Sequence, residues 1–316
     1  MAEPVSAAIP AHSASVVIPA HNEEGVLRRC LDGLLAGTEP GELDVVVVAN
    51  ACTDRTADVA RAAGVRVVET PVPGKVNALA LGDAECRVFP RIYLDADVEL
   101  PSDSARALIA ELGRPGVLAC APVPEWDLRG ASRTARRVHR VHDLMVAPHR
   151  ALAGAGVYAL SEAGHARAFP LPDVVCDDEW VHRSFTPAER RAVPGARSVV
   201  RPARTVRAHL RRRVRVRLGN RQLEALGRPA QGRLGLRSLG ALLAARSVSP
   251  LDAVCYLAVQ LADRVLARRR GSPDAPVAWA TDTSSRADSD AAGGPGGDTG
   301  SGAITGTSRR ADGGTP

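Results

Sequence analysis

The segment LDVVVVA, residues 43–49, is a nearly uninterrupted run of branched apolar side chains. Alternating apolar and polar residues would indicate a strand with one face in water, whereas a continuous run indicates a strand that is covered on both faces, as in parallel sheets. Three more short runs have the same character, namely SVVIP at 15–19, VRVVE at 65–69 and RIYL at 91–94. The sequence therefore predicts four parallel strands packed between helices.

Helical patterns separate these strands. Asn22 is placed to cap a helix that ends at Gly37, and Thr53 or Asp54 is placed to cap a second one. A third helix is expected to begin near Lys75. Alternation of strand and helix is typical of βαβ units, so we expect an α/β fold with a mostly parallel, Rossmann-like sheet flanked by helices.

Polar clusters follow each predicted strand. They are His21–Glu24, Asn50–Asp54, Glu69, and Asp95 with Asp97. Ligands of open α/β sheets bind beyond the carboxyl ends of the strands, so these clusters should converge on one crevice.

Asp95 and Asp97 stand one residue apart in RIYLDADVEL, residues 91–100. On extended backbone their side chains would share a face, and neighbouring carboxylates raise each other's pKa unless a cation offsets the repulsion. Oxygen-only ligation suits Mg²⁺ or Mn²⁺. The alternative is a strand that ends in a solvated turn, with Asp97 or Asp103 capping the helix after Pro101. These ten residues alone leave both interpretations open.

The charge of the chain favours an anionic partner. Its 316 residues include 41 lysines and arginines, of which only Lys75 is lysine, and the formal net charge is +6. Nucleotide phosphates, nucleic acid or an acidic membrane surface would all suit this charge. Aromatic residues make up only 3% of the chain, which argues against a single-strand nucleic-acid binder. The six cysteines have no zinc spacing, so we interpret them as free thiols in a reducing compartment.

The ends of the chain differ in amino-acid composition from its middle. We expect a tail at 1–13, a catalytic domain at 14–225, a helical extension at 226–270 and a disordered tail at 271–316, which has little to bury. The N-terminus lacks a signal-peptide pattern, and the longest apolar stretch near the C-terminus is too short to span a bilayer. These features predict a cytoplasmic protein.

An amphipathic helix is predicted at 251–266. We expect it to pack on the catalytic domain, because Asp252 and Asp263 lie off its apolar stripe and anionic lipid would repel them. Peripheral contact with a membrane is the alternative. The predicted stripe consists of Leu251, Val254, Cys255, Ala258, Leu261, Ala262 and Val265.

Five motifs occur in a recognisable order: VVIPAHNEE, VVVVANACTDRTADVA, GKVNALALGDA, YLDADVEL, and GAGVYALSEAGHARAF followed by VVCDDEWVHR. In this order they resemble glycosyltransferase family 2, inverting enzymes of the GT-A fold that transfer sugars from nucleotide sugars. The resemblance covers residues 14 to about 223. The Gln-x-x-Arg-Trp motif of the processive synthases is missing from this chain, which argues against a polymerising synthase.

The resemblance implies roles for particular residues. Asp97, together with Asp95, would bind Mg²⁺ or Mn²⁺, and Asp178, or else Asp177, would be the base that accepts a proton from the acceptor hydroxyl. The donor would be a nucleotide sugar and the acceptor is unknown. The residues implied to bind the nucleotide sugar are Pro19, His21, Asn22, Glu23, Asn50, Asp54, Lys75 and Asp95, with Arg213 and Arg217 facing the diphosphate.

Other interpretations have weaker sequence support. A sugar nucleotidyltransferase would carry a glycine-rich basic loop after the first strand, and PAHNEEG is not such a loop. Nucleic-acid binding through the arginine-rich segment 201–221 would leave the strand-end clusters unexplained, so we expect no nucleic-acid partner. The intact acidic pairs argue against an inactive scaffold. Asp54 and Asp178 could instead act as helix caps, and Glu23 could complement a helix dipole.

Overall fold

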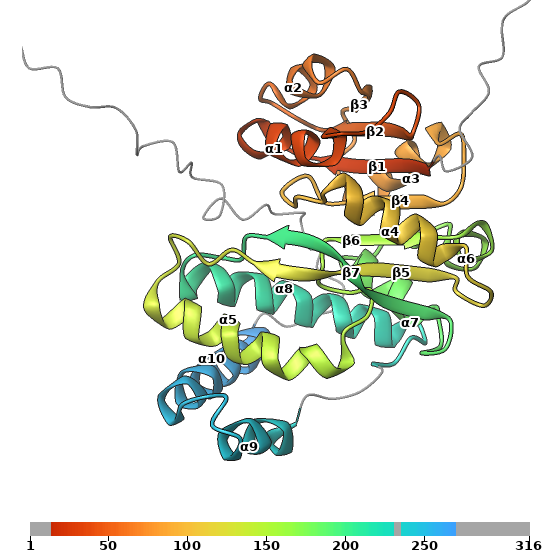
Figure 1. Ribbon diagram of the computed structural model, residues 1–316. Helices are drawn as coiled ribbons and strands as arrows, with labels where there is room; N and C mark the ends of the chain where they lie inside the picture. The colour runs from red at the N-terminus through yellow and green to blue at the C-terminus, as the bar shows by residue number, and fades with distance from the viewer. Residues whose placement is uncertain (1–13, 231–234, 270–316) are drawn as a thin grey trace, which may run out of the picture.

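The four predicted strands form one half of a seven-stranded sheet (Figure 1). The structure is a computed structural model that describes residues 14–230 and 235–269. Within this half all neighbouring strands pair in parallel, in the order β3-β2-β1-β4. The strands are β1 (Ala14–Ala20), β2 (Leu43–Asn50), β3 (Arg66–Thr70) and β4 (Arg91–Leu94).

Helices cover both faces of this half of the sheet, which explains why its strands are apolar on both sides. On one face Val16 and Ile18 pack with α1 (Glu24–Leu35), α2 (Thr56–Ala62) and α4 (Ser102–Leu112). On the other face Val17 packs with α3 (Lys75–Glu85). A Cβ added at Gly82 of α3 would lie 2.5 Å from Val17 Cγ1, so the glycine lets α3 approach the sheet closely.

The other half of the sheet contains one strand of opposite direction. Its order is β4-β6-β5-β7, and β6 pairs antiparallel with both β4 and β5. The strands are β5 (Ala119–Trp126), β6 (Val157–Leu160) and β7 (Arg190–Val200). Because β6 is reversed, the loop that precedes it reaches the edge of the sheet where β4 ends.

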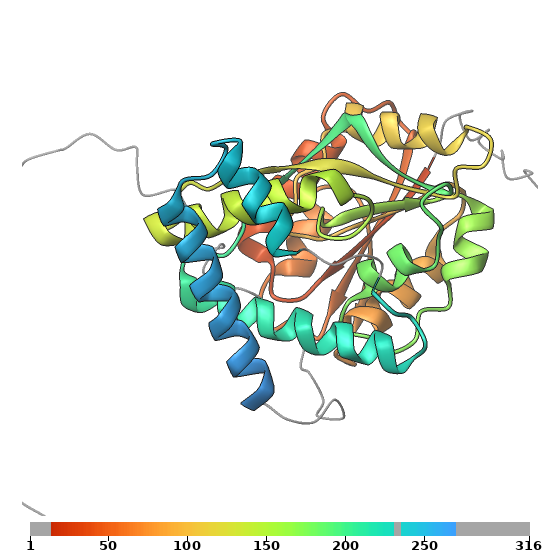
Figure 2. The same ribbon diagram turned by 90° about the horizontal axis from the view of Figure 1, so that it is seen from below.

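Helices α5, α8, α9 and α10 form a second layer, best seen in Figure 2. An apolar cluster that includes Val141, Leu239 and Tyr256 joins α5, α8, α9 and α10. The helices of the predicted extension, α9 and α10, therefore pack against α5 and α8. The helices of this half are α5 (Arg133–Val146), α6 (Glu162–Ala168), α7 (Asp177–Arg183), α8 (Val206–Ala225), α9 (Leu236–Ala244) and α10 (Pro250–Arg269), with a 3₁₀ turn at Ala147–His149.

The face that α10 buries is not the predicted one. Ala253, Tyr256 and Val259 are buried, whereas most of the predicted stripe is exposed. Asp252 and Asp263 are buried as well, because arginines of α5 and α8 neutralise them. The prediction failed because α10 is apolar on nearly every side, so its periodicity does not single out one face.

Some sequence predictions lie outside the described residues, namely the tails at 1–13 and 271–316. In the part of the chain that the structure describes, no helix is both long and apolar enough to cross a membrane.

Candidate active site

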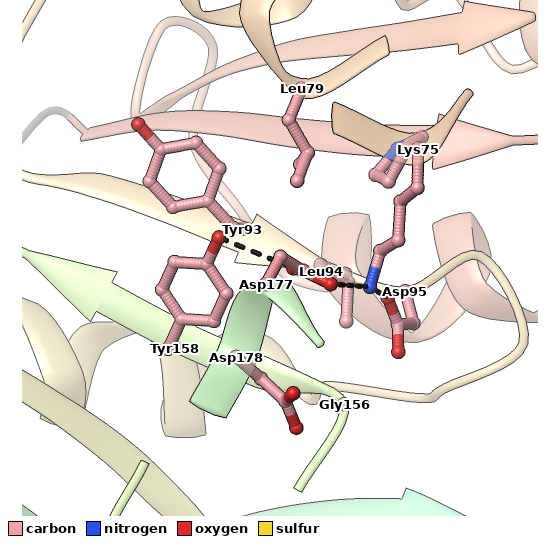
Figure 3. A pocket seen from close by; sticks show the side chains of 10 residues that line it. Lys75, Leu79, Tyr93, Leu94, Asp95, Gly156, Tyr158, Asp177 and Asp178 are labelled. Atoms are coloured by element: carbon pink, nitrogen blue, oxygen red, sulfur yellow. Dashed lines mark hydrogen bonds and ion pairs between the residues drawn. The ribbon is translucent and has the colours of Figure 1, made fainter. Parts of the chain in front are cut away.

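A pocket lies at the carboxyl ends of β1 and β4 (Figure 3). It brings together residues from β1, α3, β4, α7 and the segment around the start of β6, so it joins the two halves of the sheet. The lining residues are Pro19, Lys75, Leu79, Tyr93, Leu94, Asp95, Gly156, Tyr158, Asp177 and Asp178.

Lys75 forms ion pairs with two carboxylates that line this pocket. It is the first residue of α3, and its Nζ lies 2.8 Å from Asp95 Oδ1 and 2.9 Å from Asp177 Oδ1 (Figure 3). Burial alone would lower the pKa of Lys75, but attraction to Asp177 and Asp95 outweighs burial and raises it. The ammonium group is therefore charged at neutral pH and links the end of β4 to the start of α7.

Asp177 is the more deeply buried member of the acidic pair, at 3% exposure. Burial raises the pKa of its carboxyl group to about 6, even though the nearby Lys75 favours the charged form. The Tyr158 hydroxyl donates a long hydrogen bond of 3.5 Å to Asp177 Oδ2. Asp177 is thus held between a cation and a phenol.

Asp178 is less buried than Asp177 and lies on the Gly156 side of the pocket (Figure 3). Its Oδ2 accepts the backbone N–H of Gly154 at 2.9 Å, and its Oδ1 accepts the N–H of Glu179 at 2.8 Å. Burial raises the pKa of this carboxyl group as well. Both aspartates stand in the first turn of α7, where the helix dipole favours negative charge.

The turn after β4 corrects one expectation. The strand ends at Leu94, and the Val98 N–H donates to the Asp95 carbonyl at 3.1 Å, so residues 95–98 form a turn and not extended backbone. The strand stops here because Ala96 and Val98 turn into the core. Asp97 is half-buried and does not line the pocket. Neither Asp97 nor Asp103 caps α4, whose N-cap is Pro101.

Gly156 fits closely over this turn. Its carbonyl accepts the Asp95 N–H at 2.9 Å, and its φ of +66° is a conformation that favours glycine. A Cβ at this position would lie 2.5 Å from Val98 Cγ2 and 3.5 Å from Asp95 Oδ2. The glycine therefore lets the segment before β6 pack directly against the Asp95 turn.

The polar clusters after β1 and β2 bind each other. His21 Nδ1 lies 2.7 Å from the Asn50 carbonyl, and Asn22 Oδ1 accepts the Thr53 N–H at 2.8 Å. Asn22 adopts a positive φ, and the N-cap of α1 is Glu23, so the predicted cap by Asn22 is wrong. The Glu23 N–H donates to Thr56 Oγ1 at 2.8 Å. These contacts fix the two loops to each other beside the pocket.

Two further residues of these clusters position neighbouring backbone. Asn50 Oδ1 accepts the Gly74 N–H at 3.0 Å, which anchors the segment just before Lys75. Asp54 Oδ2 accepts the Glu24 N–H at 3.1 Å, and Oδ1 accepts the Thr56 N–H at 3.0 Å, as a helix-capping carboxylate does. Of the residues implied to contact the nucleotide, Pro19, Lys75 and Asp95 line the pocket, and for the others contact with a nucleotide stays a prediction.

Arg213 and Arg217 do not lie at this pocket. Both belong to α8 and pair with the buried Asp263 of α10, with Arg217 Nε 3.2 Å from Asp263 Oδ2. Their contact with a diphosphate stays a prediction, and in this structure the buried carboxylate of Asp263 pairs with both guanidinium groups.

The sequence did not identify the aromatic wall of the pocket. Tyr93 and Tyr158 stack with their ring centroids 4.9 Å apart, on β4 and β6 respectively. Each lies within a recognised motif, Tyr93 in YLDADVEL and Tyr158 in GAGVYALSEAGHARAF, but nothing in the sequence shows that the two strands are neighbours.

A divalent cation would find only part of its ligands here. Among residues 14–230 and 235–269, no group of three or more His, Cys, Asp or Glu side chains is placed to enclose a metal ion. Asp95 and Asp97 offer carboxylate oxygens on one turn. This arrangement fits Mg²⁺ or Mn²⁺, which often take one or two protein carboxylates and complete their coordination with substrate phosphates.

Comparisons with known proteins agree with the observed fold. Residues 15–153 match the family model described as Glycosyl transferase family 2. A mannosyltransferase from Pyrobaculum calidifontis, solved with GDP-Man and Mn²⁺, is similar with 20% identity and a TM-score of 0.53, over 82% of this chain and 76% of that one. A mannosyl-3-phosphoglycerate synthase from Rubrobacter xylanophilus has 22% identity and a TM-score of 0.48, over 70% and 77%. The likeness to the first shows a GT-A-like fold. No curated protein matches the chain.

Proposed function

We propose, since the chain belongs to glycosyltransferase family 2 through residues 15–153, that it transfers a sugar from a nucleoside-diphosphate sugar to an acceptor hydroxyl in one inverting displacement. One observation carries this proposal. The Lys75 ammonium group joins Asp95 at the end of β4 to Asp177 at the start of α7, so a donor-side and an acceptor-side carboxylate share one pocket.

The donor side of the reaction must stabilise a leaving diphosphate. Lys75 supplies a fixed positive charge close to Asp95, and a pre-positioned charge is effective because it needs no rearrangement during the reaction. Asp95 and Asp97 are the proposed ligands of Mg²⁺ or Mn²⁺, which when bound supplies Lewis-acid stabilisation to the diphosphate oxygens. The loops after β1 and β2, which hydrogen bonds hold to each other, would bind the nucleoside.

The acceptor side must remove a proton from the attacking hydroxyl. We assign this role to Asp178, because the ion pair with Lys75 and the hydrogen bond from Tyr158 already engage Asp177. The Gly154 N–H and Glu179 N–H orient the Asp178 carboxylate at the pocket. A proton transferred to Asp178 would leave the acceptor oxygen free to attack the anomeric carbon opposite the diphosphate.

Metal-dependent nucleotide binding tests the proposal. Calorimetric titration of UDP and of GDP in the presence of Mn²⁺ should show binding to the unaltered protein and much weaker binding to Asp97→Ala. Asp103→Ala is the matched control, because its carboxylate is exposed on α4 and pairs only with Arg106 on the same helix. Equal affinities in EDTA and in Mn²⁺ would contradict the proposed metal site.

A further inference from the structure

Helix α10 lies at the outside of the helical layer (Figure 2). One of its faces exposes large apolar side chains. We name this face the α10 stripe and define it as Leu251, Val254, Ala258, Leu261 and Val265. Their spacing of three and four residues places them on one side of the helix over about four turns. Val254 is 63% and Leu261 62% exposed. A face of this kind in contact with water indicates an interaction surface.

Between residues 235 and 268, the exposed charged side chains are all positive. Arg264 and Arg268 are exposed on α10, and Arg237 and Arg246 are exposed on α9 and just after it. Between residues 235 and 268 the only carboxylates are Asp252 and Asp263, and both are buried.

Those two aspartates were the reason to expect repulsion from anionic lipid, and the structure removes that reason. Asp252 pairs with Arg137 of α5, and Asp263 pairs with Arg217 of α8. Neutralised and turned inward, neither carboxylate presents negative charge at the stripe.

Other occupants fit these charges less well. A second copy of the chain would add the same arginines to the interface, and no exposed carboxylate between residues 235 and 268 could pair with them. Residues 271–316 contain only Val277, Trp279 and Ile304 as large apolar side chains, too few to cover the stripe.

We propose that α10 lies on an anionic membrane surface, with the α10 stripe in the interface and its flanking arginines at the lipid headgroups. A helix with an apolar face and arginines beside it binds in the plane of the interface, and apolar burial and attraction to anionic lipid both contribute. This contact concerns α10 alone and does not depend on the proposed sugar transfer.

Vesicle sedimentation of the full chain tests the proposal. The protein should pellet with vesicles of phosphatidylcholine and phosphatidylglycerol, and much less with phosphatidylcholine alone or at high salt. Leu261→Glu should weaken the pelleting by roughly tenfold or more, because the variant loses apolar burial and adds a repelled charge. Arg264→Gln should weaken it roughly fivefold, the value of one basic residue near an anionic surface.

Leu226→Glu is the matched control, since this leucine is also half exposed but follows α8. It should pellet like the unaltered protein. Equal pelleting of Leu261→Glu and the unaltered protein would overturn the proposal. The proposal would also be overturned if light scattering without vesicles showed a dimer of the unaltered protein and a monomer of Leu261→Glu. If Leu261→Glu fails to fold, the pelleting of the unaltered protein decides the question. Pelleting that depends neither on anionic lipid nor on salt would overturn the proposal.

Discussion

Replacement of Lys75 by methionine should change how stability depends on pH, because Lys75 limits the rise in the pKa of Asp177. Two unit charges 2.9 Å apart, as in this pair, attract by roughly 6 kcal/mol at an effective dielectric constant of about 20. Breaking one partner of a buried pair typically costs about 3–5 kcal/mol. With about 3 kcal/mol as the lower bound, Lys75→Met should raise the pKa of Asp177 from about 6 to roughly 8.

The sign of the effect follows from proton binding. In the unaltered protein the pKa of Asp177 is raised above its ordinary value of 3.8, so the folded state binds the proton more tightly than the unfolded state. The free energy of unfolding therefore falls as pH rises from about 4 to 6 and then levels off. In Lys75→Met this fall should continue to about pH 8. The difference in unfolding free energy between the two proteins should thus widen by about 3 kcal/mol between pH 6 and pH 8.

Urea denaturation at a series of pH values measures this difference directly. Lys75 itself adds no pH dependence in this window, since its pKa is raised above the ordinary lysine value. Arg28→Met is the matched control, because the Arg28–Asp32 pair is exposed on both sides and should be worth less than about 1 kcal/mol. Two parallel stability curves for Lys75→Met and the unaltered protein would refute the reasoning.

Two further predictions concern the acidic pair of the pocket and the glycines before β6. Asp178→Asn should lower kcat by roughly 10²–10⁴-fold with little change in donor affinity, since a base acts in the transition state, and steady-state kinetics with a donor titration checks this. If Asp177→Asn loses activity in this way and Asp178→Asn does not, the base is Asp177. Gly156→Ala should lower the unfolding free energy by roughly 2–4 kcal/mol, because the new Cβ would meet Val98 in a strained backbone conformation. Gly154→Ala, with φ of +84° and open space around it, should lose only about 1–2 kcal/mol, and equal losses would show that contact with Val98 does not matter.

The parallel half of the sheet could be predicted from sequence because its signals are local. Strands β1 to β4 are short apolar runs, and α3 begins at Lys75 as expected. The pairing of Lys75 with Asp177 could not be predicted, because the two residues are far apart in sequence and meet only through the order of the strands. The family resemblance placed both residues in the site without showing that they touch.

The half of the sheet that contains β5, β6 and β7 was harder to predict from sequence, for a physical reason. Strand β7 carries three arginines together with Pro194 and Gly195, and its register with β5 shifts next to Pro122, so neither strand has a regular pattern. The buried face of α10 depends on arginines of α5 and α8 that accept Asp252 and Asp263, and no local rule reveals such long-range neutralisation.

Because strand β6 is reversed, the pocket is built from two separate segments of the chain. One segment contains β1 to β4, and the other runs from the loop before β6 to α7. Leu94 of β4 lies opposite Val157 of β6, so the Asp95 turn and the loop ending in Gly156 meet at one edge although they come from opposite directions. The segment that matches the family model ends at residue 153, just before this loop. Exchange of the stretch from β6 to α7 between relatives would therefore replace the Asp177–Asp178 side and leave the loops of β1 and β2 intact. Under the proposed function, such chimaeras would change the acceptor selectivity and leave the donor-binding loops unchanged.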